Sequence, residues 1–437
     1  MDKQTLKRLL YEAVDSAAEE VRSFAEDIAA HPELGFFEER TAAKLKEALC
    51  GLGLDVKSGL ARTGLRADVE GGAAGPKVAI IGELDGIVCR RHPMADPDSG
   101  ASHSCGHNLQ LAALYAAASA LAKTGLAKEL SGTVSFLGTP AEEFIEVARR
   151  KELRDSGELV YYCGKQEFVR LGVFDDIDMS IMVHAGDDEP SPVFSVPDGG
   201  NGFRIFMLRY EGRQAHAAAA PHLGVNALYA AVAGINAVNA LRETFRDEDH
   251  IRVHYIITKG GDSVNSVPDD VRIEGYVRAG SAAVIDETFD KVIRAFKAGG
   301  EALGAKCHVT SVAGDMPLNA CKELNEIFAE NAASLIGGDN VRRGTYFAAS
   351  TDLGDIAHIM PAIQPLGGGV IGALHSKEFK VVDFEAAALT PAKAMLATVV
   401  DLLGDGARRA DELLKNFKPV YTKEEYLRAM DRRFYSE

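Results

Sequence analysis

Apolar positions along the chain alternate between helical spacing and short continuous runs, a pattern typical of an α/β protein. Between residues 3 and 31 apolar side chains recur every three or four positions, and this spacing predicts an amphipathic helix. A second helix is predicted over 37–51, where it ends at a glycine. Strands are predicted over 61–69 and 77–82, and the second of these, KVAIIG, is a continuous apolar run typical of a buried strand.

Three predicted buried strands each run into polar residues. These are Asp85 after 77–82, Glu142 and Glu143 after 132–138, and His184 after 179–183. Because α/β sheets place their chemistry at the carboxyl ends of the strands, we expect these side chains to converge at one edge. A Glu-Glu pair by itself is usually a solvated helix start. The prediction of a functional site therefore depends on the three strand ends meeting at one edge of the sheet.

From residue 202 onward the pattern changes. Strands and helices follow in the order β-α-β-β-α-β, which is the ferredoxin-like split βαβ arrangement. With 437 residues the chain is too long for one compact core. We therefore predict a discontinuous catalytic domain, formed by residues 1–200 and 313–437, with a second domain of residues 201–312 inserted into it.

Charge and cysteine content narrow the function classes. The formal net charge of −16 argues against a nucleic-acid or anionic-membrane surface, where a basic face is expected. The first 34 residues are charged throughout and show no apolar core of a signal peptide, so we expect a cytoplasmic protein. The six cysteines do not have the spacing of a disulfide framework, so we expect reduced thiols. A cysteine with a special role would be a metal ligand or a nucleophile.

Candidate chemistry begins at residues 99–111, which read SGASHSCGHNLQL. Cys105 and His107 lie two residues apart in a glycine-rich loop before an alanine-rich helical segment, so both side chains can face one metal ion. A free cysteine is more often a small core residue, so the pair alone leaves both interpretations open. Two interpretations of His103 also stay open: it is an additional metal ligand, or it is a structural or exposed side chain.

Seven motifs follow one another along the chain: HPELGFFEERTA (31–42), SCGHNLQLAAL (104–114), GTPAEE (138–143), VHA (183–185), GRQAHAAAAPHLGVNAL (212–228), GGDSVNSVPDD (260–270) and LHSKEF (374–379). In these motifs the chain resembles the dinuclear metallohydrolases that include aminoacylases, carboxypeptidases and dipeptidases (metallopeptidase clan MH). It is most similar to the subgroup of aminobenzoyl-glutamate hydrolase and the plant auxin-amino-acid amidohydrolases. The resemblance covers about residues 20–405. It implies a zinc-peptidase-like catalytic domain with an inserted ferredoxin-like α+β lid that also carries the dimer contact.

The resemblance also implies roles for individual residues. It makes five residues ligands of two divalent metal ions: Cys105, His107, Glu143, His184 and His375. Glu142 is then the general base toward a metal-activated water, and Asp85 orients a ligand or the metal pair. In the lid the resemblance implies substrate contacts from His216, Asn265 and Arg278.

The expected function is that of a metal-dependent amidohydrolase. It would cleave the C–N amide bond of an N-acyl amino acid, a dipeptide or an aminobenzoyl-amino acid, as a homodimer formed through residues 201–312, with no nucleic-acid or membrane partner. The metals would be manganese or zinc, with cobalt or nickel possible. Two alternatives stay open: a deaminase that releases ammonia from an aromatic amine on the same site, and a non-catalytic ligand-binding relative.

Three departures from the family pattern bear on substrate choice. Asn108, after the Cys-Gly-His motif, favours the aminobenzoyl-glutamate branch. Glu83-Leu84-Asp85 stands where many relatives have an Asp-x-Asp pair. The segment 145–165 is longer than in relatives and follows the Glu pair directly, so we expect it to reshape the pocket.

Overall fold

The computed structural model describes residues 1–186 and 188–437, and these form two compact units. The first unit comprises Met1–Gly199, Asn319–Tyr346 and Asp355–Thr422. The second unit comprises Gly200–Leu318, Phe347–Gly354 and Lys423–Glu437. The second unit thus includes residues 347–354 and 423–437, which the sequence pattern assigned to the catalytic domain.

The C-terminal tail joins the second unit for a physical reason. Its last strand, β19 (Tyr435–Ser436), pairs antiparallel with β13 (Lys306–Ala313). Just before it, the buried guanidinium of Arg433 lies 3.0 Å from the Asp286 carboxylate. A short polar tail carries little hydrophobic signal, so its place in a sheet edge was not visible in the sequence.

A six-stranded sheet organises the first unit, and its strands lie in the order β1-β2-β6-β3-β7-β15. The strands are β1 (Val56–Leu60), β2 (Gly64–Glu70), β6 (Ser131–Thr139), β3 (Ala73–Glu83), β7 (Met179–Ile181) and β15 (Ala362–Ile363). Strand β3 is parallel to both neighbours, β6 and β7, and β15 continues parallel to β7. The three buried strands expected from the sequence are therefore adjacent, and their carboxyl ends share one edge.

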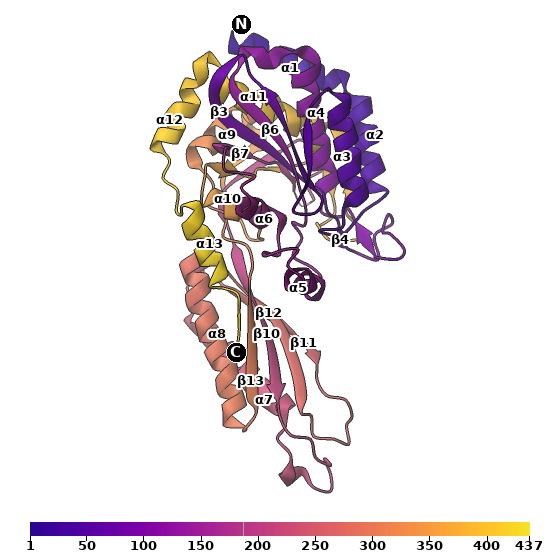
Figure 1. Ribbon diagram of the computed structural model, residues 1–437, viewed down its shortest axis with the longest axis vertical. Coiled ribbons are helices and arrows are strands. Elements are labelled where there is room, and N and C mark those ends of the chain that lie inside the picture. The colour runs from indigo at the N-terminus through magenta and orange to yellow at the C-terminus, as the bar shows by residue number, and fades with distance from the viewer. Residues whose placement is uncertain (187) are drawn as a thin grey trace. The chain divides into compact units, whose positions relative to one another are not determined.

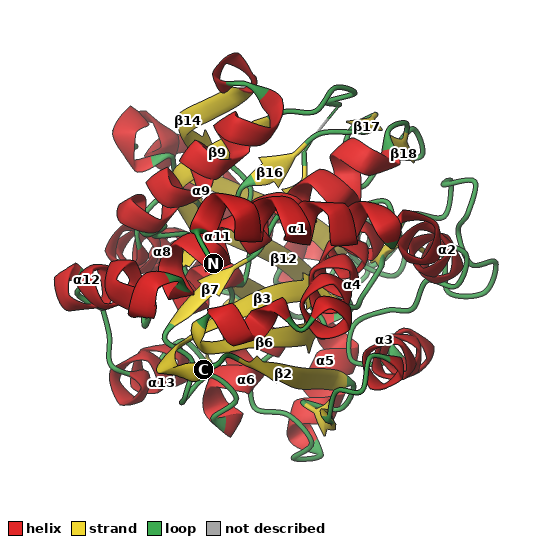
Figure 2. Ribbon diagram, turned by 90° about the horizontal axis from the view of Figure 1, so that it is seen from above, coloured by secondary structure: helices red, strands yellow, loops and turns green. Residues whose placement is uncertain are grey.

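The next elements are the helices that lie wholly or partly in the first unit. They are α1 (Lys3–Ser16), α2 (Ala18–Ala29), α3 (Glu39–Gly51), α4 (His107–Thr124), α5 (Val147–Asp155), α6 (Gly164–Leu171), α9 (Lys322–Ile336), α10 (Leu353–Ala357), α11 (Thr390–Leu403) and α12 (Arg408–Asn416). Figure 2 shows α1, α4 and α11 lying over one face of the sheet. The helix predicted over 3–31 is two helices, because the chain leaves helical geometry at Ala17 (φ −92°, ψ 0°).

One helical stretch of the described chain, Glu385–Leu403, is long and apolar enough to cross a membrane. It is 94% buried within the protein, which is the behaviour of a core helix. Helix α4 is buried on nearly every side as well, from His107 to Leu121. The loop that carries Cys105 and His107 is therefore anchored to a helix in the centre of the unit.

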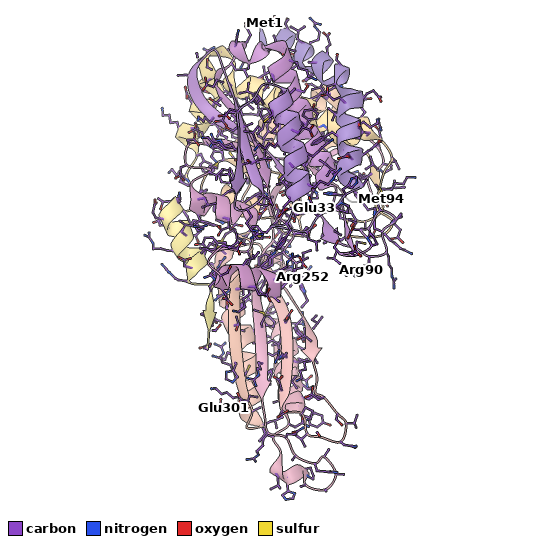
Figure 3. All side chains as sticks on the ribbon, turned by 45° about the vertical axis from the view of Figure 1, so that its right-hand side comes forward. Met1, Glu33, Arg90, Met94, Arg252 and Glu301 are labelled. Carbon is purple, nitrogen blue, oxygen red and sulfur yellow. The ribbon has the colours of Figure 1, made fainter. Side chains whose placement is uncertain are left out.

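Short strands complete the first unit. A four-stranded sheet has the order β14-β9-β16-β8, formed by β14 (Val341–Phe347), β9 (Phe194–Gly200), β16 (Leu366–Gly367) and β8 (His184–Ala185). Two small hairpins are formed by β4 (Ile87–Val88) with β5 (Ala101–Ser102) and by β17 (Val370–Ile371) with β18 (Lys380–Val381). Arg90 and Met94 lie on the loop between β4 and β5 (Figure 3).

The second unit is a five-stranded antiparallel sheet in the order β11-β12-β10-β13-β19 (Figure 1). Three of its strands are β10 (Gly202–Glu211), β11 (Arg252–Lys259) and β12 (Asp270–Ala279). Its helices include α7 (Ala227–Leu241), α8 (Ala282–Ala302) and α13 (Lys423–Asp431). Helices α7 and α8 pack on the sheet around Phe206, Phe289 and Phe296. The βαββαβ order predicted from the sequence is confirmed, with β19 added at the edge beside β13.

Candidate metal centre and active site

The site lies where the parallel strands of the first unit end. Strand β3 ends at Glu83, two residues before Asp85, and β6 ends at Thr139, shortly before Glu142. His184 begins β8, three residues after β7 ends at Ile181. The sheet thus brings acidic and imidazole side chains to one edge, as parallel α/β sheets do with their functional groups.

Gly106 sets the geometry of the loop that meets these strand ends. It is the N-cap of α4 and has φ +82°, a left-handed conformation that costs other residues energy. A Cβ at this position would lie 2.8 Å from the Ala185 Cβ. The close approach of the two chain segments places Cys105 and His107, on either side of Gly106, beside the strand that carries His184.

Cys105, His107 and His184 form a first buried cluster, in which the potential ligand atoms lie within 4.8 Å of one another. The Cys105 Sγ is 3.4 Å from the His184 Nε2. Each imidazole places its Nδ1 2.7 Å from a main-chain oxygen, that of Asp85 for His107 and that of Ala185 for His184. Nδ1–H donation to those carbonyls leaves both Nε2 lone pairs available to a metal.

A second cluster shares the same thiol. It consists of Cys105, Glu143 and His375, again with potential ligand atoms within 4.8 Å. The His375 Nε2 lies 3.1 Å from the Cys105 Sγ and 3.0 Å from the Glu143 Oε1. Cys105 thus belongs to both clusters, so the five ligand-type residues form two overlapping groups that share one sulfur.

The donor atoms fit a divalent metal. In 1–186 and 188–437 the buried His107 Nε2 and Glu143 Oε1 make no hydrogen bond of ordinary geometry. Each lies near one other polar group, the Glu83 carboxylate at 3.2 Å from His107 and the His375 Nε2 at 3.0 Å from Glu143. Buried polar atoms are normally satisfied, so these two are explained by a ligand that accepts their lone pairs. The set of imidazole nitrogen, carboxylate oxygen and thiolate sulfur suits zinc and related first-row ions.

Electrostatics around Cys105 agree with a metal site. Burial, with the nearby Glu143 and Glu142 carboxylates, raises the pKa of the Cys105 thiol well above its usual value. Burial opposes a charge on His107, but Glu83 and Asp85 outweigh it and raise the pKa of this histidine to about 10. The metal-free cluster therefore holds protons at these groups, and a bound cation would displace them.

Asp85 is hydrogen-bonded to two of the candidate ligands. Its main-chain oxygen binds His107, its Oδ1 lies 3.2 Å from the His107 Nδ1, and its Oδ2 accepts from the Glu143 main-chain N at 2.9 Å. These contacts hold the imidazole and the Glu143 backbone in place. They are the contacts that an orienting carboxylate makes behind a metal ligand.

Glu142 occupies a different position from Glu143. Its side chain is 10% exposed, and its Oε2 lies 3.9 Å from the His107 Nε2. Glu83, His107 and Glu142 form a third group whose ligand atoms lie within 4.8 Å. Glu142 is thus adjacent to the cluster and accessible enough to meet a substrate or a water molecule.

Sequence reasoning missed a buried ionic network behind this group. The Lys165 Nζ lies 2.5 Å from the Glu83 Oε1, and the Gln110 Nε2 lies 2.7 Å from the Glu83 Oε2. Lys165 and Glu83 are fully buried, and the Glu83 Oε2 is also 3.2 Å from the His107 Nε2. Glu83 is visible in the sequence as a departure from an Asp-x-Asp pattern, whereas Lys165 lies beside a charged segment and gives no signal.

Glu38 is a further buried acid near the site, and it comes from the HPELGFFEERTA motif. It accepts hydrogen bonds from the Thr63 hydroxyl at 2.6 Å and from the Ala141 main-chain N at 2.8 Å. Burial, followed by the Asp85 charge, raises the pKa of Glu38 to about 8. The carboxyl group is therefore protonated at neutral pH in the metal-free protein. Its hydrogen bond with Ala141 links the 31–42 motif to the loop before Glu142.

The long segment 145–165 packs behind the Glu pair. It contains α5, and its buried Arg150 donates hydrogen bonds to the main-chain carbonyls of Glu143 and Tyr162. Phe144 and Tyr162 lie with ring centroids 5.9 Å apart. The segment thus buttresses the backbone of Glu143 and adds aromatic surface next to Glu142.

The three lid residues lie in the second unit, at two places. His216 and Asn265 are exposed and lie on adjoining segments, since the Ala217 N donates to the Asn265 O at 2.9 Å. The His216 Nδ1 accepts from the main-chain N of Ala218 and Ala219, so its Nε2 carries the proton. Arg278 donates to the Ser350 Oγ at 2.7 Å and to the His254 Nε2 at 3.1 Å.

Arg278 is far from the other two lid residues within one chain. Arg278 is eight residues beyond Asp270, the first residue of β12. The segment that contains Asn265 leads into the Asp270 end of this strand. At a rise of about 3.3 Å per residue, these eight residues span about 26 Å. A single copy of the second unit therefore cannot bring Arg278 and His216 to the same small molecule.

The chain is similar in sequence to known proteins. Residues 200–303 match the peptidase dimerisation domain of the M20 family. The chain is 29% identical to a Mus musculus Xaa-Arg dipeptidase over 449 residues, which cover 97% of this chain and 95% of the relative. It is 30% identical to one chain of the Escherichia coli p-aminobenzoyl-glutamate hydrolase, over 67% of this chain and 57% of that protein.

A solved structure shares the fold. It is a Bacillus subtilis protein described as a dinuclear metal binding peptidase from the M20 family, with a TM-score of 0.69 and 20% sequence identity. The match covers 89% of this chain and 99% of the other. The two-unit architecture is therefore that of a known group of proteins along nearly its full length.

Proposed function

We propose that this chain is a metal-dependent hydrolase of the M20 peptidase group, as its dimerisation domain and its relatives indicate. It cleaves the amide bond of an N-acyl amino acid, a dipeptide or an aminobenzoyl-amino acid. The single observation that carries the proposal is the buried Cys105, shared by two clusters of ligand-type side chains with Glu142 alongside. A cytoplasmic location is part of the proposal, because none of the six cysteines forms a disulfide in the described residues, as in a reducing compartment.

The candidate ligands would hold two divalent ions, which we propose to be zinc or manganese, with cobalt or nickel as further options. His107 and His184 would bind one ion and Glu143 and His375 the other, with Cys105 between them. Ions held there would supply positive charge to polarise the scissile carbonyl and acidify water. Asp85 keeps the His107 tautomer that presents Nε2 to the cluster.

Glu142 is the proposed general base. Its partly exposed carboxylate can accept a proton from the attacking water and later return that proton to the leaving amine. Glu143 cannot share this role, since its Oε1 is 3.0 Å from the His375 Nε2 and its backbone is held by Asp85. Two adjacent glutamates thus have separate tasks, because Glu143 contacts His375 whereas Glu142 lies near His107.

A homodimer is the second part of the proposal. The second unit matches a dimerisation domain. Arg278 lies about 26 Å by strand rise from Asp270, the end of β12 into which the segment beside His216 leads. We infer that His216 and Asn265 serve the partner's site, where the His216 Nε2–H would stabilise the developing oxyanion. Arg278 would pair with a substrate carboxylate in a two-pronged contact.

Substitution of Glu142 by Gln tests the mechanism. We expect hydrolysis of acyl-amino acids and dipeptides to fall by at least about 10³-fold, because the general base is lost while the ligand set is intact. Elemental analysis should still find about two metal ions per chain, as the five ligands predict. The matched control is Glu152→Gln, an exposed glutamate on α5.

The outcomes separate the possible functions. Retained turnover in the Glu142→Gln variant would refute the mechanism. Release of ammonia from aromatic amines, with no amide cleavage, would favour a deaminase. Full metal occupancy without turnover of any tested amide would indicate a ligand-binding relative.

A further inference from the structure

A cavity lies in the first unit, and the candidate metal ligands do not line it. Its volume is about 620 Å³, and none of Cys105, His107, Glu142, Glu143, His184 or His375 lines it. Its walls come from α2, from the loop between β4 and β5, from the segment that includes β18, and from His103, Asn108 and Leu109. The volume falls in the range of sites that bind small organic molecules.

The walls are mostly apolar. Ala25 and Ala29 come from one side, Met94 from a second, and Phe379 and Phe384 from a third. Phe379 and Phe384 are buried, whereas charged side chains such as Arg22 and Lys377 are exposed. Arg22 lies over the Phe384 ring at 4.4 Å, so its charge is directed to an aromatic face. An apolar cavity with charges at its rim favours an uncharged ring inside.

His103 supplies the unexplained polar group of this cavity. It is 5% exposed, and neither ring nitrogen has a hydrogen-bond partner anywhere in 1–186 or 188–437. The neighbouring His92 is different, since its Nδ1 accepts from the Met94 main-chain N and its Nε2 lies 3.1 Å from the Phe379 carbonyl oxygen. A neutral imidazole has one donor and one acceptor, and leaving both unused in a buried place costs free energy.

We propose that this cavity binds a small aromatic molecule with one neutral hydrogen-bonding group, such as a phenol, against His103. The ring would pack on Phe379, Phe384 and Met94, and its polar group would pair with the imidazole. Because His103 and Asn108 flank Cys105 and His107, a bound molecule also stabilises the loop that carries these two residues. The cavity is thus an effector site whose occupancy slows metal loss.

Phenol and toluene provide the test, because they have the same shape and differ in the hydroxyl group. On the metal-loaded enzyme, calorimetry should give a phenol dissociation constant on the order of 1 mM, as expected for a ligand of this size. Toluene should bind at least about fivefold more weakly, through loss of one hydrogen bond. In His103→Phe the preference for phenol over toluene should be lost, because no imidazole then pairs with the hydroxyl group.

Ala29→Trp locates the binding. Ala29 is half-buried at the end of α2 and lines the cavity, so an indole there fills it and should abolish binding of both probes. The matched control is Ala30→Trp, at an exposed position that does not line the cavity. Phenol should also slow the release of metal to a chelator in wild type, and leave that rate unchanged in Ala29→Trp.

Several results would overturn the proposal. They are absence of phenol binding to wild type, equal binding of phenol and toluene, or binding that persists in Ala29→Trp. Unchanged metal release despite binding would remove the effector role. If Ala29→Trp fails to fold by circular dichroism, the phenol-to-toluene ratio in His103→Phe still decides the case.

Discussion

Lys165 and Glu83 form a fully buried ion pair beside the candidate metal centre, with the ammonium nitrogen 2.5 Å from the carboxylate. Removing one partner of such a pair leaves an uncompensated charge, at a typical cost of about 3–5 kcal/mol. We therefore expect Lys165→Met to lose about that much stability in urea unfolding, a large share of the total for a protein domain. Metal affinity should fall too, because Glu83 also lies 3.2 Å from the His107 Nε2.

A double variant isolates the pair. In Glu83→Gln/Lys165→Met both charges are absent, so much of the lost stability should return. Lys151→Met, which removes an exposed partner of Asp155, is the matched control and should change stability by less than about 1 kcal/mol. Equal losses in the Lys165 and Lys151 variants would contradict a buried pair.

The two clusters that share Cys105 predict different metal losses. We expect Cys105→Ala to lower the content of both ions, because its sulfur belongs to both groups. His184→Asn and His375→Asn should each weaken one ion, since each histidine belongs to one group with Cys105. Elemental analysis after dialysis measures this, and exposed Cys50→Ala is the control. Loss of a single ion in Cys105→Ala would refute the shared position.

The sequence allowed much of this architecture to be predicted, for a physical reason. Continuous apolar runs marked β3, β6 and β7, and parallel strands necessarily end at one edge, so Asp85 and His184 could be placed near each other. Lys165 could not be found this way, because a lysine beside a charged segment normally faces solvent. Its burial depends on Glu83, a partner 82 residues away along the chain.

Gly106 should be intolerant of a side chain. It combines φ +82° with a Cβ position 2.8 Å from the Ala185 Cβ, so Gly106→Ala should suffer both backbone strain and overlap. We expect a loss of about 2–4 kcal/mol in urea unfolding and reduced metal content. Gly125→Ala is the control, because Gly125 has φ +66° but no atom within 4 Å of its Cβ position. If both variants lose the same stability, the overlap with Ala185 is unimportant.

Glu38 predicts how the stability of the metal-free protein depends on pH. Burial and the Asp85 charge raise the pKa of Glu38 from 4.5 to about 8 in the folded state. Between these values the unfolded chain has lost the proton that the folded chain keeps, so the contribution of Glu38 to stability falls as pH rises. Urea midpoints in the presence of a chelator should decline less from about pH 5 to about pH 8 in Glu38→Gln than in wild type. Parallel curves would show that Glu38 is ionised in the folded protein.

Mixing two inactive variants tests whether one active site uses residues of two chains. In a heterodimer of Glu142→Gln and His216→Ala chains, one site combines an intact Glu142 with the intact His216 of the partner. Random exchange makes about half of the dimers heterodimers with one working site of two, so about a quarter of wild-type activity should appear. If His216 served its own chain, each site of the heterodimer would lack one residue, and mixing would restore nothing. The control mixes Glu142→Gln with a Glu142→Gln/His216→Ala chain, which has no intact Glu142 and should stay inactive in either arrangement.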